Sequence, residues 1–212
     1  MRTERALVRR SFRSLCLLGL FIAGMPPAVG HEHMQQMPMA QALSGRSVYN
    51  LASVWTNQSG MAVALASLRG RPVVAAMVYT HCKDVCPLIT EKMLEIGDKL
   101  PKQSLDQVRF VLFSLDWVRD TPAQLTKFAA QHHLDLKRWT LLHGDESAVR
   151  ELAAVLGVSF YRDENGDFQH SIAIFLLDAN GVISEQESDI QAPPARLVKS
   201  IRNLLAKGNQ SR

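Results

Sequence analysis

The sequence predicts an α/β domain with a central mixed sheet flanked by helices and with an N-terminal β-hairpin. Short, almost continuously apolar runs, which are typical of strands buried on both faces, alternate with segments whose apolar residues recur at helical spacing. Turn and helix-start signals, such as Asn-Gly pairs and Thr-Pro, separate these segments. The chain has 212 residues, of which 47% are hydrophobic, and this suits one folded domain with additional segments.

The domain is expected to begin with a hairpin, in which residues 48–55 and 61–65 flank a turn that contains Gly60. The next run, residues 73–79, is apolar throughout and predicts the central strand. The later elements are predicted, in chain order, as a helix over 87–100, a strand over 108–115, a helix from Thr121-Pro122 to about 132, a strand over 139–142, a helix from Asp145 to 156, a polar turn over 162–167, a strand over 171–177, a strand over 182–187 and a helix from Pro193 to about 206. The early β–α–β part should be parallel and the late hairpin antiparallel.

The central strand leads into a loop in which three residues separate Cys82 from Cys86, and Pro87 follows at once. Proline is favoured at the first helical position because its missing N–H needs no partner there, so Cys86 is expected at a helix N-terminus. The partial positive charge of that terminus stabilises a thiolate, which is the nucleophilic and metal-binding form of cysteine. Open α/β sheets carry their sites at the carboxyl ends of strands, which makes this loop the candidate site. A structural disulfide is the alternative, although a loop this short removes little chain entropy.

Residues 1–30 have the three parts of an export signal peptide: a basic segment, an apolar segment from Leu15 to Met25, and small residues at 28–30. The apolar segment is too short to span a bilayer comfortably, which takes ~20 residues. We therefore expect a periplasmic protein with a cleaved leader; a membrane-anchored form and an organellar transit peptide are the alternatives. The Arg9–Phe12 segment resembles the core of a twin-arginine signal, so both export routes stay open.

The charge of the chain gives no argument for a nucleic-acid partner. The leader holds five arginines and one glutamate, which accounts for the formal net charge of +4. The rest of the chain has 19 basic and 19 acidic side chains and no recognisable nucleic-acid-binding motif. We expect no nucleic acid among the partners.

Residues 31–47 are interpreted as a flexible arm ahead of the folded domain, which is expected to span 48–212. The arm is rich in histidine and methionine, namely His31, His33, Met34, Met37 and Met39. If cleavage follows Gly30, a free amino terminus with histidine in third place suits Cu(II), and thioethers suit Cu(I). A linker without any metal role is the alternative.

Two thiolates and one nitrogen satisfy a soft Cu(I) ion, so the histidines of the domain are the next candidates. They are His81, His132, His133, His143 and His170. His132 and His133 lie at a predicted helix end and His143 in a predicted turn, where solvated histidines are common. The side chain of His81 should point away from Cys82, because neighbouring side chains alternate on an extended segment. His170 lies between a polar turn and a buried strand, and spacing alone leaves it one candidate among several.

These motifs together resemble the Sco/SenC family, copper-binding proteins with a thioredoxin-like fold that assist assembly of cytochrome c oxidase. The matching residues are Tyr79-Thr80-His81-Cys82-Lys83-Asp84-Val85-Cys86-Pro87, Asp116, Arg119-Asp120-Thr121-Pro122, His170-Ser171, Ile174-Phe175-Leu176-Leu177-Asp178 and Gly181. The likeness spans about residues 48–206. It implies a thioredoxin-like fold, copper as the bound ion, and Cys82, Cys86 and His170 as the metal ligands, with Asp116 in a supporting acidic loop.

The sequence departs from the family pattern at two places near the site. Lys83 stands where the family usually has proline, and a cation there could help to keep both thiolates ionised. Trp117-Val118 replaces a proline and an acidic residue. A changed docking of the partner is the alternative effect of Lys83. The loss of the acidic residue at Trp117-Val118 concerns contacts with a partner rather than the ligand set.

The resemblance implies a copper chaperone that binds Cu(I) or Cu(II) and delivers it to the CuA-bearing subunit of the oxidase or to a copper carrier. The leader implies export, and we expect a monomer. Membrane contact is then expected only through the partner or an uncleaved leader. The alternative is an enzyme, a thiol-disulfide oxidoreductase that uses Cys82 and Cys86 as a redox pair to reduce the cysteines of the target site. That activity does not need His170, whereas copper binding by the family's ligand set does. Zinc is disfavoured because a closed structural site takes four protein ligands, and no serine–histidine signature indicates a hydrolase.

Overall fold

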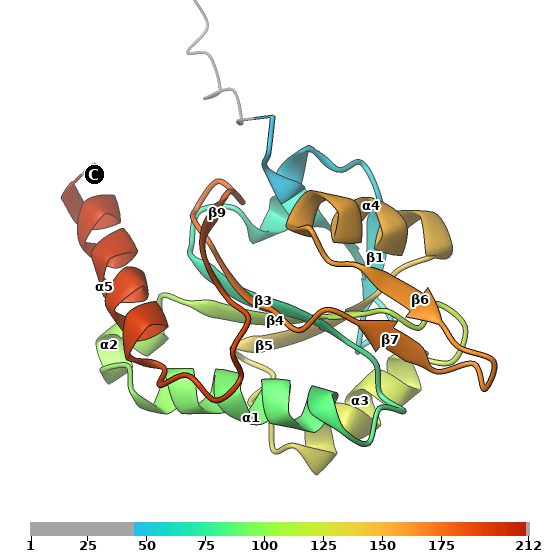
Figure 1. Cartoon of the computed structure of the whole chain (residues 1–212). Coiled ribbons are helices and arrows are strands. Elements are labelled where there is room, and N and C mark those ends of the chain that lie inside the picture. The colour runs from blue at the N-terminus through green and yellow to red at the C-terminus, as the bar shows by residue number, and fades with distance from the viewer. Residues whose placement is uncertain (1–44, 211–212) are drawn as a thin grey trace, which may run out of the picture. The chain divides into compact units, whose positions relative to one another are not determined.

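The computed structural model describes residues 45–210, and a mixed sheet with helices on both sides forms their core. The strands of the main sheet are β1 (Val54–Asn57), β2 (Ala62–Ala64), β3 (Val73–Val78), β4 (Arg109–Ser114), β5 (Trp139–His143), β8 (Ile174–Leu177) and β9 (Ile183–Glu187), and a separate hairpin comprises β6 (Phe160–Arg162) and β7 (Phe168–His170). The helices are η1 (Val48–Asn50), η2 (Leu65–Leu68), α1 (Val85–Asp98), α2 (Lys102–Leu105), α3 (Pro122–Gln131), α4 (Glu146–Leu156) and α5 (Ala195–Gln210). Helices α1 and α3 cover one side of the sheet and α4 lies on the other (Figure 1). The predicted fold class is confirmed.

The main sheet has the strand order β2-β1-β5-β4-β3-β8-β9. Strands β3, β4 and β5 run parallel, whereas β8 pairs antiparallel with β3 and with β9. The predicted parallel β–α–β part and antiparallel late hairpin are therefore confirmed. All six residues of β3 are buried, because neighbouring strands and covering helices enclose it on every side. The loop with the cysteines leaves the carboxyl end of this central strand.

The N-terminal hairpin is present, but its first arm is shorter than predicted. Residues 48–50 form the 3₁₀ helix η1 rather than the start of a strand, and β1 begins only at Val54. Ser47 explains the difference, because its hydroxyl accepts the N–H of Tyr49 and donates to the carbonyl of Asn180. This contact with a distant loop bends the chain into a turn. The hairpin turn itself is closed by Asn57, whose side-chain oxygen accepts the N–H groups of Ser59 and Met61.

Helix α1 begins two residues earlier than predicted, at Val85. Cys86 and Pro87 therefore occupy the second and third helical positions, rather than the position before the helix and its first residue. Proline is tolerated there because the first four N–H groups of a helix have no partner within the helix. The expectation that Cys86 lies at a helix N-terminus is confirmed.

The strand predicted over 171–177 begins only at Ile174, and residues 171–173 belong to neither sheet. Ser171 makes two hydrogen bonds with Ser159: its N–H donates to the Ser159 carbonyl, and its hydroxyl accepts the Ser159 N–H. Only from Ile174 onward does the chain pair with β3. The predicted polar turn over 162–167 connects β6 and β7, so His170 is the last residue of a small hairpin beside the main sheet. The short helix α2 was not predicted.

Several expectations fall on residues that the structure does not describe. The signal peptide at 1–30 lies wholly outside residues 45–210, and so do the histidines and methionines of the arm. Among the helices of the described part, none has the length and the apolar character needed to cross a bilayer. The boundaries at residues 30 and 47 stay predictions.

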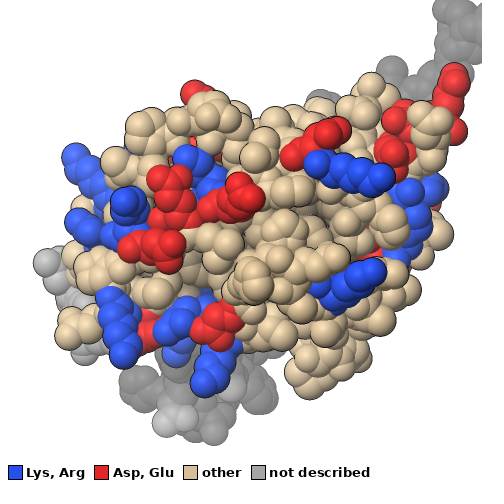
Figure 2. All heavy atoms as spheres, turned by 90° about the horizontal axis from the view of Figure 1, so that it is seen from below, with Lys and Arg blue, Asp and Glu red and all other residues tan. Residues whose placement is uncertain are grey.

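Charges are intermixed on the face that carries α1 and α3. Figure 2 shows this face with lysines and arginines next to aspartates and glutamates rather than in a continuous basic stripe. Nucleic-acid-binding surfaces typically present such a stripe. The appearance of this face agrees with the balanced charge of the chain after residue 30.

Candidate metal centre

The two cysteines lie together at the carboxyl end of β3. Cys86 is completely buried in the first turn of α1, and Cys82 is partly exposed in the loop before it. Both are free thiols in this structure. The backbone N–H of Cys86 donates to Sγ of Cys82 over 3.4 Å. The helix therefore presents its N-terminal donors to the sulfur of Cys82, whereas the sequence led us to expect the stabilised thiolate at Cys86 itself.

The two thiols have opposite acidities. The thiol of Cys86 donates a hydrogen bond to Cys82 and so lowers the pKa of Cys82 to about 5; burial opposes this effect, and the N–H groups of Cys86, Asp84 and Val85 add to it. The same hydrogen bond, together with burial, raises the pKa of Cys86. The reduced pair therefore consists of one thiolate, at Cys82, and one thiol, at Cys86. A thiolate at a helix N-terminus is a nucleophile and a ligand for soft metal ions.

His170 faces the cysteines from the end of β7. Its Nε2 atom lies 3.8 Å from Sγ of Cys86. On the other side of the ring, Nδ1 lies 3.1 Å from the carbonyl oxygen of Ser171, which can only accept a hydrogen bond. Nδ1 therefore carries the proton and Nε2 presents its lone pair to Cys86, the arrangement typical of metal-binding histidines. Burial lowers the pKa of His170, which favours the neutral ring that a metal ion needs.

The spacing of these atoms allows one ion to bind both Cys86 and His170. Bond lengths of about 2.3 Å to sulfur and about 2.0 Å to nitrogen, as in zinc sites, together exceed the 3.8 Å between the two atoms. The donor atoms of Cys82, Cys86 and His170 do not all lie within 4.8 Å of one another. An ion held by all three would therefore require a side chain or the β6–β7 hairpin to move.

A second cluster, formed by His81, Asp116 and Asp120, brings its donor atoms within 4.8 Å of one another. Its carboxylates already have partners in the protein. Asp120 accepts the N–H and the hydroxyl of Thr80 at 2.9 and 2.5 Å and the hydroxyl of Ser114 at 2.6 Å. Asp116 accepts two N–H groups of its own loop and the guanidinium of Arg119. These bonds give both carboxylates a role in holding loops in place.

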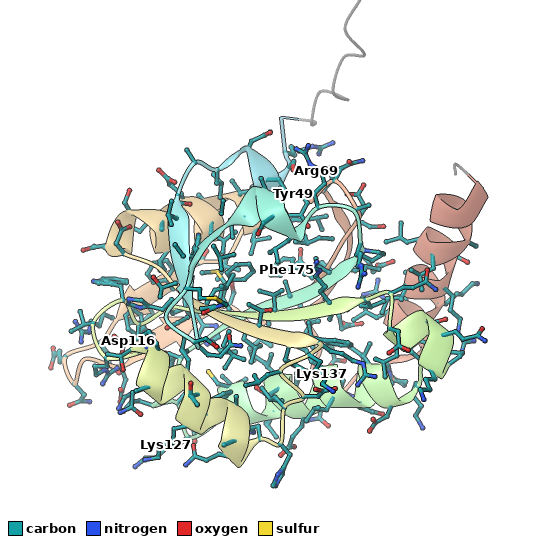
Figure 3. All side chains as sticks on the ribbon, turned by 180° about the vertical axis from the view of Figure 1, so that it is seen from behind. Tyr49, Arg69, Asp116, Lys127, Lys137 and Phe175 are labelled. Carbon is teal, nitrogen blue, oxygen red and sulfur yellow. The ribbon has the colours of Figure 1, made fainter. Side chains whose placement is uncertain are left out.

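Asp116 lies at the end of the sheet opposite α5 (Figure 3). It is completely buried and contacts Arg119, and its supporting role in the acidic loop near the site stays a prediction. The part played by Asp120 was missed in the sequence, although Asp120 belongs to the motif that carries the resemblance. Its position shortly after β4 was the available signal, because polar side chains at strand ends often hold neighbouring loops.

The other histidines of the described part lie elsewhere or serve other contacts. The side chain of His81 is 44% exposed, and its Nδ1 lies 3.3 Å from the Thr80 hydroxyl and 3.6 Å from a carboxylate oxygen of Asp120. The ring of His132 packs 4.2 Å from the ring of Phe128, and burial lowers its pKa. His133 ends the α3 region with a left-handed backbone. His143 is the last residue of β5 and pairs with Thr56, so it belongs to a strand rather than to the predicted turn.

Comparison with known proteins gives a consistent picture. A family model described as SCO1/SenC matches residues 45–206. The "SCO1 protein homolog" of Bacillus subtilis is 31% identical over 141 residues, which cover 65% of this chain and 72% of the relative. Among solved structures, copper-bound ScoI of Bradyrhizobium japonicum is 25% identical with a TM-score of 0.61, covering 72% of this chain and 96% of that one. BsSco, described as a member of the Sco family of cytochrome c oxidase assembly proteins, is 27% identical with a TM-score of 0.62, covering 71% and 90%. This chain therefore belongs to the SCO1/SenC family and has its thioredoxin-like fold.

Proposed function

We propose that this protein is an exported copper chaperone that binds Cu(I) and Cu(II) through Cys82, Cys86 and His170 and delivers the ion during assembly of the CuA site of cytochrome c oxidase. One observation carries the proposal. A lone-pair nitrogen of His170 lies 3.8 Å from the sulfur of Cys86, next to the thiolate of Cys82. Two sulfurs and one imidazole nitrogen are the donor set that soft copper ions prefer.

The exposure of the site supports a role in transfer. Cys86 is buried and anchored in α1, whereas Cys82 is partly exposed. A thiolate or imidazole of a partner can therefore approach an ion at the site from the side of Cys82 and replace one ligand at a time. Binding the ion requires Cys86 to release its proton, because the thiolate is the metal-binding form. The copper found in the ScoI structure and the description of BsSco support copper as the cargo and the oxidase as its destination.

Copper titration of the reduced, metal-free protein under anaerobic conditions tests this function. The wild type should bind one copper ion and show sulfur-to-copper charge transfer with Cu(II). We expect Cys82→Ser to weaken copper binding and to alter the charge-transfer band, since Cys86 is then the one sulfur ligand left of the proposed set, and His170→Ala to weaken binding by about tenfold or more. His132→Ala is the control, because His132 packs against Phe128 away from the cysteines. Unchanged stoichiometry and affinity in both site variants would refute the proposal.

A second candidate function, thiol-disulfide exchange, is favoured by the acidities of the pair. The thiolate of Cys82, with its pKa near 5, can attack one sulfur of a target disulfide and release the other sulfur as a thiolate. Cys86, after losing its proton to solvent, can then attack the sulfur of Cys82. This closes a Cys82–Cys86 disulfide, and the target has gained two electrons. Reductase turnover that persists in His170→Ala, in a protein that binds no copper, would favour this function over delivery.

The location of the protein is part of the proposal. We expect export to the periplasm with cleavage after Gly30, so that the mature chain begins at His31. Mass spectrometry of the protein recovered from a periplasmic fraction measures the mature N-terminus directly. A chain that retains residues 1–30 would instead favour the membrane-anchored form.

A further inference from the structure

Arg119 joins the loop after β4 to the hairpin that carries His170. Its Nη2 atom donates to the carbonyl of Gly166 at 2.8 Å, and both terminal nitrogens lie 3.3 Å from a carboxylate oxygen of Asp167. On the other side, its Nε donates to the carboxylate of Asp116, which is completely buried. One guanidinium therefore spans a carboxylate fixed at the end of the sheet and the tip of the hairpin.

The β6–β7 hairpin depends on such contacts for its position. It is a two-stranded unit outside the main sheet, and an isolated two-stranded hairpin is only marginally stable in water. The loop that supplies Arg119 also supplies Trp117, whose ring packs edge-on at 5.4 Å from Phe168 and at 6.3 Å from Phe160. The ion pair of Arg119 therefore holds the tip of the hairpin against this loop, and the ring contacts of Trp117 hold its strands against the same loop.

The neighbouring residue holds the other half of the site. Asp120 bonds twice to Thr80, which lies two residues before Cys82. Adjacent residues of one loop, Arg119 and Asp120, thus contact the segment of the histidine and the segment of the cysteines. Cys86 is fixed within α1 and fully buried, so the distance between its sulfur and His170 depends mainly on where the hairpin lies.

We propose that Arg119 is a positioning residue for metal binding: by holding the hairpin tip through Asp167 and Gly166, it keeps Nε2 of His170 within reach of the cysteine sulfurs. This inference rests on the proposed function, since it takes His170 as a copper ligand. Without the guanidinium the two thiols stay in place, and the imidazole is the ligand that is lost. The expected defect is therefore specific to the nitrogen donor.

The test uses the full mature protein and two readouts. In the metal-free, reduced state, hydrogen exchange of the amides in β6 and β7 reports how firmly the hairpin is held. In the Cu(II) complex, pulsed EPR detects the remote nitrogen of a bound imidazole, and absorption detects sulfur ligation. For Arg119→Gln we expect exchange in the hairpin to accelerate by about tenfold or more, the imidazole signal to weaken or vanish, and the sulfur-to-copper band to persist.

Arg138→Gln is the matched control. Arg138 also bridges two carboxylates, Asp106 and Asp135, and its side chain is 31% exposed against 28% for Arg119. It precedes β5, at the end of the parallel strands opposite the cysteines. This control should leave both readouts at the wild-type level. Arg119→Lys keeps the charge but loses the planar guanidinium. Its hairpin exchange rate and its imidazole signal should therefore lie between those of the wild type and of Arg119→Gln.

Asp167→Asn breaks the same ion pair at a side chain that is 47% exposed, so this variant should fold. It replaces Arg119→Gln in the test if that variant does not fold. Hairpin exchange and an imidazole signal that stay at the wild-type level in Arg119→Gln or in Asp167→Asn would overturn the inference. The proposed function fails separately, if the wild-type copper complex itself shows no imidazole nitrogen. The hydrogen exchange of the metal-free protein then still decides whether Arg119 holds the hairpin.

Discussion

Nε2 of His170 and Sγ of Cys86 lie 3.8 Å apart, although 84 residues separate the two in the chain. The contact exists because α1 starts at the carboxyl end of β3, while the β6–β7 hairpin packs beside the same end through Phe168 and Tyr79, whose rings are 5.6 Å apart. A helix N-terminus and a hairpin end thus meet around one thiolate and one thiol. The acid–base properties of this small group lead to the first two predictions.

We predict that, of the two cysteines in the part of the chain that the structure describes, Cys82 reacts with iodoacetamide in the reduced, metal-free protein at mildly acidic pH and Cys86 does not. The rate of Cys82 should follow a midpoint near its pKa of about 5. Cys86 should stay unmodified, because the reagent cannot reach its buried sulfur. Its hydrogen bond with Cys82 and its burial also raise its pKa. Mass spectrometry after timed alkylation at a series of pH values measures both rates. Reactivity of Cys82 that rises only near the ordinary thiol pKa of about 8.5 would contradict this assignment.

Cys86→Ala provides the control for the cause of this acidity. The hydrogen bond from the Cys86 thiol is the largest contribution that lowers the pKa of Cys82. Its removal should move the alkylation midpoint of Cys82 upward, toward the ordinary value. A midpoint that does not move would assign the acidity to the backbone N–H groups instead.

The free energy of unfolding of the reduced, metal-free domain should pass through a maximum at about pH 8.5, the ordinary thiol pKa. The pKa of Cys82 is lower in the folded than in the unfolded state, so its stabilisation is present above the unfolded pKa and is lost as pH falls toward about 5. The pKa of Cys86 is raised, so its contribution is present below the unfolded pKa and is lost as pH rises above it. Burial also lowers the pKa of His170, which reinforces the loss on the acidic side.

Urea denaturation across this pH range, with a reductant and a chelator present, measures the profile. In the Cys82→Ser/Cys86→Ser double variant, the free energy of unfolding should vary less with pH above the pKa of His170, because both thiols that cause the variation are removed. A double variant with the same maximum as the wild type would show that other groups cause it.

Asp120→Asn should destabilise the domain by about 1–3 kcal/mol, since an amide cannot accept all the hydrogen bonds that the buried carboxylate accepts from Thr80 and Ser114. The NH₂ group of the new asparagine would face at least one of the N–H or O–H donors that now bond to the carboxylate, and two donors that face each other form no hydrogen bond. Asp135→Asn is the control: that carboxylate is 44% exposed and pairs with Arg138 at the surface, where ion pairs contribute little. Equal midpoints of urea denaturation for both variants would contradict the buried network.

Much of the fold could be predicted because the decisive signals are local. The run before Cys82 is apolar on both faces of the strand, and Thr121-Pro122 and Asp145 begin helices where capping predicts them, with side-chain oxygens accepting the N–H groups of Gln124 and Ala148. Cys86 at a helix N-terminus followed from the proline beside it. These features need no knowledge of distant segments.

The differences arise where distant contacts override local pattern. Ser47 turns η1 through a bond to Asn180, which lies 133 residues away in the chain. Arg119 meets Asp167 across 48 residues, and no periodicity indicates that pair. For the same reason spacing left His170 as one candidate among several histidines, and only the resemblance to a family singled it out. The lone pair directed at Cys86 depends on a hairpin whose docking is a tertiary property.

Gly181→Ala should be among the most destabilising single changes outside the site. Gly181 has a φ of +77°, where an L-residue costs about 1–2 kcal/mol, and a Cβ placed there would lie 2.6 Å from the ring of Tyr49. Tyr49 is buried and labelled beside Arg69 in Figure 3, and its ring cannot move without disturbing η1. Overpacking of this kind adds about 1–3 kcal/mol. We therefore expect a total loss of about 2–5 kcal/mol.

Gly60→Ala separates the two contributions. Gly60 has almost the same φ, +79°, but nothing lies within 4 Å of the position its Cβ would take. Only the backbone cost of about 1–2 kcal/mol should appear there. Urea denaturation of both variants gives the steric contribution of the Tyr49 contact as the difference. Equal losses at the two glycines would show that the ring of Tyr49 moves aside, and that the contact between η1 and the loop before β9 is less rigid than its geometry implies.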